Sequence, residues 1–270
     1  MNIEIYYFSG TGNSLAVARD LAAKMNARLI PIATVMDQES IMTDADRIGI
    51  VFPLYDFKPP LIVDKFVEKL TCRTAKYLFA VGTYGIAPLK AMKYFAKVLK
   101  SHGGNPAAGF AVQMPHNGIG SSLFSQFQYE VMFKNWEVKC EEIVEYVTAG
   151  KKGRVETSNI FTSLIFSGLL VKIIPLLLKL LKQVILKGWK SLALIACENC
   201  DGCGICYRVC PVNNIKIVDN KPVWSGHCAV CLACFHWCPK QAVKMGDTNM
   251  NIKQYHHPQV ELSDMLRQVK

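Results

Sequence analysis

Along residues 1–150, short continuous apolar runs alternate with longer stretches of mixed apolar and polar character. Continuous apolar runs indicate strands that are covered on both faces, whereas longer amphipathic stretches indicate helices. The runs predict strands at residues 3–8, 28–32, 47–52, 77–81 and 108–114. The intervening stretches predict helices at residues 14–25, 60–70, 87–100 and 124–147. This alternation is typical of an α/β domain built on a parallel sheet.

Five such strands favour a doubly wound sheet with the order 2-1-3-4-5. In sheets of this order a ligand binds outside the carboxyl ends of the strands, at the switch point beside the first and third strands. The loops that follow these strands are therefore the first place to look for a binding site.

The loop after the first predicted strand is rich in glycine and small polar residues and leads into a helix. Its glycines allow backbone N–H groups to converge on a phosphate, and the helix N-terminus adds a favourable dipole. It has neither the lysine of a nucleoside-triphosphate loop nor the spacing of a dinucleotide fingerprint, which favours a single phosphate. The alternative is an ordinary glycine-rich turn. The loop residues are Ser9, Gly10, Thr11, Gly12, Asn13 and Ser14.

Two further loops follow the third and fourth predicted strands, next to the expected phosphate. Each contains a tyrosine, Tyr55 or Tyr84, which could flank a planar ring or simply pack within its loop. The residues expected to line the ligand are Pro53, Leu54, Tyr55 and Asp56 in one loop and Thr83, Tyr84 and Gly85 in the other.

Through these three loops, residues 1–150 resemble the flavodoxin family. The resemblance implies that FMN binds here, with its phosphate on the first loop and its isoalloxazine ring against the two tyrosine loops. The chain lacks the strongly acidic rim of simple flavodoxins, so the resemblance does not extend to redox potential or choice of partner.

Eight of the eleven cysteines form two copies of one pattern, C-x2-C-x2-C-x3-C-P, spaced by 28 residues. In this bacterial ferredoxin run the fourth cysteine ligates the cluster of the other run. The pattern therefore predicts two [4Fe–4S] clusters with crossed ligands. One cluster is expected on Cys200, Cys203, Cys206 and Cys238, and the other on Cys228, Cys231, Cys234 and Cys210.

The alternatives for these cysteines are zinc sites and disulfides. Zinc prefers pairs of ligands separated by a longer gap. Disulfides need an oxidising compartment, whereas Met1 leads directly into a strand-like run without the basic start of a signal peptide, so a cytoplasmic protein is expected. Cys197 has Ser225 as its repeat mate and is expected to be a bystander, and Cys72 and Cys140 are expected to be buried apolar residues.

As a whole, the chain resembles the EFR1 family, the ferredoxin-fused flavodoxin proteins of anaerobic bacteria. The residues that carry this resemblance are the phosphate-type loop, the two cysteine runs and the Met114-Pro115-His116-Asn117 stretch after the fifth predicted strand. The resemblance implies a flavodoxin-like domain followed by a small α+β ferredoxin domain with two clusters.

The formal charge of +10 is concentrated in one segment. Residues 1–150 contain 15 basic and 14 acidic side chains, residues 197–270 contain 8 and 6, and residues 151–196 contain 8 and 1. The basic excess thus belongs to a connector, and no interleaved aromatic and basic stripe indicates nucleic-acid binding. We predict three parts: an FMN-binding domain at 1–150, the connector at 151–196, and the ferredoxin domain with a C-terminal tail at 197–270.

The connector contains a basic amphipathic stretch at residues 172–190, whose five lysines fall within about 140° of arc on a helix. It could pack between the two domains, cover a substrate pocket above the flavin, or contact an anionic membrane surface from one side.

The favoured function is electron transfer between the two clusters and FMN, in an anaerobic redox pathway, with a ferredoxin or another oxidoreductase as partner. The alternative is an enzyme that reduces a small organic substrate bound over FMN beneath residues 157–190. Its candidate proton donors are Tyr55, Tyr84, His116 and the pair His256-His257, of which the pair is expected on the surface of the tail. The sequence indicates no oligomeric state.

Overall fold

The computed structural model describes residues 1–71, 77–118, 121, 124–158, 194–245 and 252–269. We call residues 1–158 the N-terminal half, residues 194–245 the C-terminal half, and residues 252–269 the C-terminal tail. The lysine-bearing stretch 172–190 and Cys72 lie outside the described residues.

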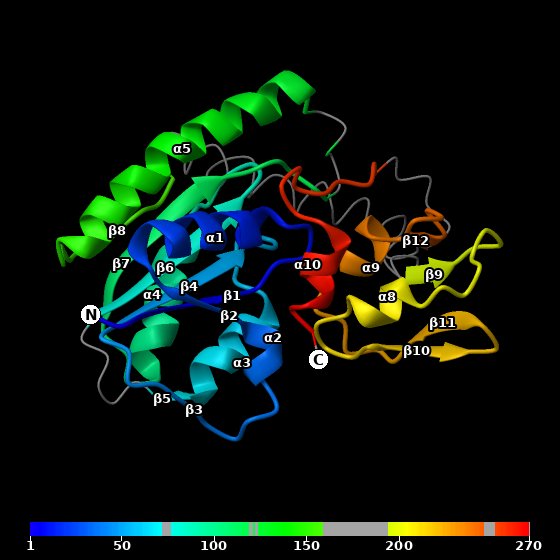
Figure 1. The fold of residues 1–270 in the computed structure, drawn as a ribbon, viewed down its shortest axis with the longest axis horizontal. Helices are drawn as coiled ribbons and strands as arrows, with labels where there is room; N and C mark the ends of the chain where they lie inside the picture. Colours follow the sequence, from blue (N-terminus) through cyan, green and yellow to red (C-terminus); the bar gives the residue numbers. More distant parts are fainter. Residues whose placement is uncertain (72–76, 119–120, 122–123, 159–193, 246–251, 270) are drawn as a thin grey trace, which may run out of the picture.

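The N-terminal half is built on a six-stranded parallel sheet with the order β2-β1-β4-β6-β7-β8 (Figure 1). Its strands are β1 (Ile3–Tyr7), β2 (Arg28–Pro31), β4 (Arg47–Pro53), β6 (Tyr77–Tyr84), β7 (Pro106–Gln113) and β8 (Arg154–Val155). The first five in this order are the five predicted strands, and they confirm the order 2-1-3-4-5 and the flavodoxin-like fold. The sixth strand, β8, was not predicted, because two residues carry no recognisable periodic pattern.

Helices cover both faces of this sheet. On one face α1 (Asn13–Met25) packs against α5 (Gln126–Thr148), and on the other α3 (Leu61–Lys69) contacts both α2 (Ile32–Val35) and α4 (Ala91–Ser101) (Figure 1). A small pair of strands, β3 (Ile41–Met42) and β5 (Leu70–Thr71), lies beside the main sheet. Six fully buried phenylalanines fill the space between the sheet and the helices: Phe8, Phe52, Phe66, Phe79, Phe95 and Phe110.

The C-terminal half is smaller and has little regular structure. Two antiparallel strand pairs, β9 (Leu194–Ala196) with β12 (Val243–Met245) and β10 (Ile215–Val218) with β11 (Lys221–Trp224), flank two short helices. These helices, α8 (Ile205–Arg208) and α9 (Ala233–His236), each begin inside a cysteine run. The residues before them, Gly204 and Leu232, are repeat mates and both have left-handed backbone angles, with φ of 73° and 55°. The two copies of the cysteine pattern therefore also share this backbone conformation.

The C-terminal tail returns to the N-terminal half and ends in α10 (Leu262–Leu266), which lies between the two halves (Figure 1). Asp264 forms a two-contact ion pair with Arg19 of α1, at 2.6 and 3.0 Å. The backbone N–H of His257 donates to the Thr11 carbonyl at 2.9 Å. His257 is only 4% exposed, so the expectation that the histidine pair lies on the tail surface is wrong for this residue.

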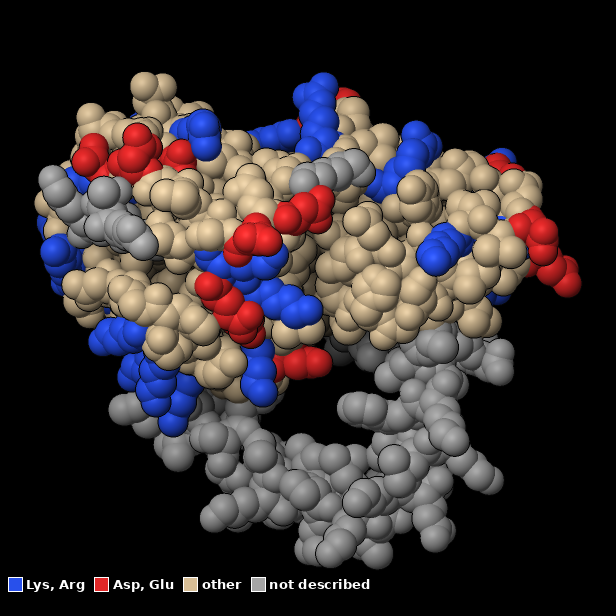
Figure 2. Space-filling model, turned by 90° about the horizontal axis from the view of Figure 1, so that it is seen from below, with Lys and Arg blue, Asp and Glu red and all other residues tan. Residues whose placement is uncertain are grey.

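On the face shown in Figure 2, basic and acidic side chains are interspersed over the described residues of both halves. Within the described parts of the chain, no helix combines the length and the apolar character that a membrane span requires.

Candidate functional site

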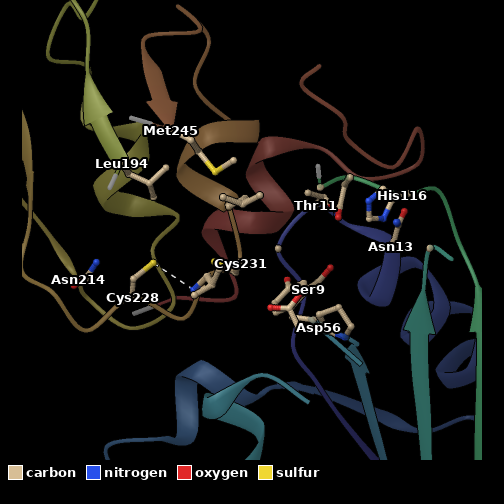
Figure 3. A pocket seen from close by; sticks show the side chains of 18 of the residues that line it. Ser9, Thr11, Asn13, Asp56, His116, Leu194, Asn214, Cys228, Cys231 and Met245 are labelled. Atoms are coloured by element: carbon tan, nitrogen blue, oxygen red, sulfur yellow. Dashed lines mark hydrogen bonds between the residues drawn. The ribbon is translucent and has the colours of Figure 1, made fainter. Parts of the chain in front are cut away.

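A cavity of about 1420 Å³ lies where the two halves meet, and the loops after β1, β4 and β6 open into it. Every predicted flavin-site residue except Gly12 lines this cavity. Figure 3 shows Ser9, Thr11 and His116 on the side of the N-terminal half, facing Cys228, Leu194 and Met245 on the other side. The parallel sheet brings the N-terminal loops together because they all follow the carboxyl ends of neighbouring strands.

Internal hydrogen bonds hold the phosphate-type loop in shape. The Gly12 N–H donates to Ser9 Oγ at 3.1 Å, and the hydroxyls of Ser14 and Thr83 share a hydrogen bond of 2.8 Å. The Asn117 amide donates to Thr11 Oγ1, which connects the loop to the segment after β7. The loop is therefore a preformed cradle at the N-terminus of α1, suited to an anion.

Gly12 was expected to line the phosphate site, but it faces the C-terminal tail instead of the cavity. A Cβ placed on it would lie 2.9 Å from Val260 Cβ and 3.0 Å from His257 Cβ. Its φ of 97° also favours glycine. Gly12 therefore shapes the loop and allows the tail to dock, and it does not line the ligand space.

The two tyrosine loops differ in how they hold their aromatic residue. Tyr55 begins a tight turn closed by two backbone hydrogen bonds of 2.9 Å to Lys58, and its hydroxyl is buried. Tyr84 ends β6, is partly exposed, and has its pKa raised chiefly by burial. Gly85 follows it and allows a close approach of His116, whose Nδ1 would lie 2.5 Å from an added Cβ.

The eight cysteines fall into the two crossed groups expected from the sequence. Burial raises the pKa of Cys206 to about 11, and the neighbouring thiolates that add to the rise are Cys238, Cys200 and Cys203. These four, which we call the distal cysteines, also line one small cavity. Burial likewise raises the pKa of Cys231, with further contributions from Cys234, Cys210 and Cys228. We call this second group the proximal cysteines, because Cys228 and Cys231 line the large cavity.

Each crossed group brings together four thiols, which is the ligand set of one [4Fe–4S] cluster. Among the described residues, no group of three or more His, Cys, Asp or Glu side chains converges enough to hold one metal ion. In a [4Fe–4S] cluster each cysteine binds a different iron. Metal binding would also deprotonate the buried thiols, whose raised pKa values otherwise keep them neutral.

The remaining cysteines have other roles. Cys197 donates from its sulfur to the Ala242 carbonyl at 3.2 Å and lines the large cavity beside the proximal group. Cys140 is buried in the N-terminal core, and burial raises its pKa to about 12. The buried position of Cys140 agrees with its expected apolar role.

The contact between the halves is tight at the second cysteine run. Trp237 Nε1 donates to the Gly10 carbonyl at 3.0 Å, and the Trp237 ring stacks on His256 at 3.9 Å. A Cβ on Gly10 would lie only 2.4 Å from the Cys231 carbonyl oxygen. The phosphate-type loop therefore touches the backbone that carries the proximal cysteines.

A buried histidine adds a second connection. His236 accepts from the Tyr255 N–H through Nδ1, so Nε2 carries the proton and donates to the Asn117 carbonyl at 2.9 Å. Burial lowers the pKa of His236 to about 4, which keeps the ring neutral. No motif predicted this contact, because the residues that form it are 119 positions apart.

Two unpartnered buried polar atoms belong to residues that line the large cavity. These are the Tyr55 hydroxyl and the Trp224 indole N–H, which faces Cys234 and lowers the pKa of that thiol. Buried polar groups normally have partners, so these two atoms are the kind of donor that a bound group would satisfy. The loop cradle, the aromatic side chains and the two cysteine groups together fit a flavin phosphate and clusters.

Comparison with known proteins supports a chain with two parts, a flavodoxin-like fold and an iron–sulfur domain. The model of the 4Fe-4S binding domain family matches residues 198–216, which contain the first cysteine run. The chain therefore combines a 4Fe-4S binding domain with a flavodoxin-like fold, the latter assigned from its own strand order. No curated protein matches this chain.

Solved structures that are similar to the chain include three redox proteins. A flavodoxin from the domain Archaea is 17% identical over 55% of this chain and 99% of its own, with a TM-score of 0.37. The flavodoxin of Megasphaera elsdenii is 21% identical over 44% and 92%, with a TM-score of 0.33. The rubredoxin oxygen:oxidoreductase of Desulfovibrio gigas is 18% identical over 55% and 36%, with a TM-score of 0.37.

Proposed function

We propose that the protein relays electrons between two [4Fe–4S] clusters and one FMN, in the manner of the EFR1 family, and serves another oxidoreductase. The observation that carries this proposal is that Cys228 and Cys231 line the same cavity as the three flavin-type loops. A cluster on the proximal cysteines would then lie beside the flavin site, and the distal cluster would lie behind it.

The residues of the chain bind and orient the proposed cofactors. The loop at residues 9–14 holds the phosphate, the loops carrying Tyr55 and Tyr84 hold the ring, and the two crossed cysteine groups hold the clusters. When bound, clusters exchange single electrons and FMN exchanges one or two, so their combination converts one kind of transfer into the other. Cys206 also contributes to the raised pKa of Cys234, so the two cysteine groups adjoin.

Each group has one exposed cysteine, Cys203 in the distal group and Cys228 in the proximal group. Because Cys228 lines the cavity expected to hold the flavin, electrons from a partner protein would enter most directly at the distal group. The expected partner is a ferredoxin or an oxidoreductase, and the expected location is the cytoplasm, where thiols stay reduced for cluster assembly. We also propose that residues 172–190 make peripheral contact with an anionic membrane surface.

A second function, reduction of a small organic substrate, is supported by the size of the cavity. Its volume of about 1420 Å³ is larger than the roughly 300–1,000 Å³ of ordinary ligand pockets, which leaves room beside a flavin. Apolar side chains of the C-terminal half, including Leu194, Val223 and Met245, line the part opposite the flavin loops. A substrate that oxidises the reduced protein catalytically, without a protein partner, would favour this function over the relay.

The cofactor content tests the proposal directly. Protein purified without oxygen should contain eight iron and eight sulfide per chain, and acid should release one FMN and no FAD. Thr11→Asp places a carboxylate against the expected phosphate, so this variant should lose FMN and keep its iron. Tight zinc with four irons or fewer would defeat the two-cluster proposal, and FMN retained by Thr11→Asp would place the flavin elsewhere.

A further inference from the structure

Within the described residues, the Tyr55 hydroxyl has no hydrogen-bond partner although this atom is completely buried. Unpartnered buried hydroxyls are rare, because losing water without gaining another partner costs stability. The turn that carries Tyr55 is closed by its own backbone hydrogen bonds to Lys58, so the position of the ring is fixed. A hydroxyl held in this way requires an acceptor that the protein atoms do not supply.

The groups around this hydroxyl show where an acceptor would lie. A Cβ placed on Gly10 would be 2.9 Å from the Tyr55 oxygen and 2.4 Å from the Cys231 carbonyl oxygen. The hydroxyl therefore lies at the contact between the phosphate-type loop and the second cysteine run. Burial raises the Tyr55 pKa well above its usual value, and the one charged group that adds to the rise is the Cys231 thiolate.

A second donor faces the same group of cysteines. The Trp224 N–H has no other partner and lowers the pKa of the Cys234 thiol, as a donor to the thiolate would. Cys231 and Cys234 are both proximal cysteines, so two otherwise unsatisfied donors lie beside the same group of cysteines. Hydrogen bonds to cluster sulfurs are among the means by which proteins set reduction potentials.

We propose that the Tyr55 hydroxyl donates a hydrogen bond to a sulfur of the cluster held by the proximal cysteines and raises its reduction potential. Reduction adds negative charge to the sulfurs, so a donor stabilises the reduced cluster more than the oxidised one. Tyr55 belongs to a loop of the flavin site and would thus tune the cluster that exchanges electrons with FMN. This inference rests on the proposed two-cluster function.

The test compares Tyr55→Phe with Tyr84→Phe in the full-length, cluster-loaded protein. Both changes remove one hydroxyl from the wall of the large cavity, but only Tyr55 lies beside Cys231. An anaerobic redox titration followed by electron paramagnetic resonance measures each cluster, and the proximal signal is the one lost in Cys210→Ala.

In Tyr55→Phe, the oxidised-to-reduced ratio of the proximal cluster at a fixed potential should rise about tenfold, a downward shift of about 59 mV for one electron. The potential of the distal cluster and the iron content should stay unchanged. Tyr84→Phe should leave both clusters unchanged. If Tyr55→Phe loses iron, Tyr55→Met, which also lacks a donor, takes its place.

Two results would overturn the inference. An unchanged proximal potential in Tyr55→Phe would show that the hydroxyl does not bond to this cluster. A shifted FMN potential with unchanged clusters would show that the hydroxyl serves the flavin instead. Failure of the proposed function is separate, because wild-type protein with fewer than eight irons would reveal it before any potential is measured.

Discussion

The two halves of the molecule build their cores from different materials. In the N-terminal half, a six-stranded sheet and its helices bury a continuous set of large apolar side chains. In the C-terminal half, the buried cluster consists mainly of Cys206, Cys210, Cys234 and Cys238, joined by Ile215, Ala242 and Val243. Regular hydrogen bonding follows the same division, since the second half has only two-stranded sheets and four-residue helices.

This contrast indicates that the halves depend on cofactors to different degrees. A large apolar core stabilises a sheet domain without any ligand, whereas a small chain with little apolar core usually needs metals or disulfides. We infer that the N-terminal half folds on its own and supplies the surface on which a cluster-dependent half is held.

Removing the clusters should produce the largest effect. In domains of this kind the free energy of metal binding drives folding, because the unfolded chain has no preformed site. Removal of the clusters by a chelator under mild oxidation should therefore unfold the C-terminal half. Hydrogen exchange should then show loss of protection in α8 and α9, with β4 and β6 still protected. Equal protection of α8 and α9 before and after iron removal would mean that this half does not depend on its clusters.

A single methyl group added at Gly10 should weaken the contact between the two halves. Gly10→Ala brings a Cβ to 2.4 Å from the Cys231 carbonyl oxygen, which is a backbone atom, and to 2.9 Å from the Tyr55 hydroxyl. Overpacking of this kind costs about 1–3 kcal/mol, so the variant should unfold earlier in denaturant and bind FMN more weakly. Gly109→Ala is the control, because its Cβ would meet Met92 atoms at an ordinary 3.6 Å. Equal stability of the two variants would contradict the tight contact.

The docking of the tail should depend weakly on pH through His257. Burial lowers its pKa to about 4 from 6.5, so the unfolded state binds the proton more tightly. Its contribution is complete above about pH 6.5 and is lost as the pH falls toward 4, which amounts to about 1 kcal/mol between pH 7.5 and 5.5. Denaturant titrations at these two pH values measure the loss.

His257→Gln should show a smaller loss of stability over the same interval, with the remainder due to His236, whose pKa burial also lowers to about 4. The His257 side chain makes a ring contact with Phe133 at 5.0 Å, so the variant should be less stable at both pH values. The difference between the two pH values is therefore the quantity to compare. An unchanged difference would contradict the burial of His257.

Sequence patterns predicted those features that are encoded locally. The apolar runs gave the five long strands and their order, and Ser125 with Gln128 forms the capping box at the start of α5, within two residues of its predicted start. The cysteine repeat predicted which thiols lie near one another, because in this motif the fourth cysteine of each run reaches the other group. The cavity-lining loops followed from the positions of strand ends.

Features that depend on distant contacts were not predictable. Gly12 resembles a phosphate-loop glycine, yet it faces Val260 and His257, which are more than 240 residues away. The predicted helix at 87–100 begins only at Ala91, because Leu89 takes a left-handed φ of 43° and bonds to Ser158. The buried position of the Tyr55 hydroxyl likewise exists only because the C-terminal half docks against Gly10.

The most direct test of the relay is the rate at which an external reduced ferredoxin reduces the flavin, measured by stopped flow in the absence of oxygen. Cys210→Ala damages the proximal group and Cys206→Ala the distal group, although the two residues are four positions apart. FMN should remain bound in both, since its site residues lie within the N-terminal half. We predict that flavin reduction slows sharply in Cys210→Ala. Unchanged flavin reduction in both variants would contradict a path through the clusters.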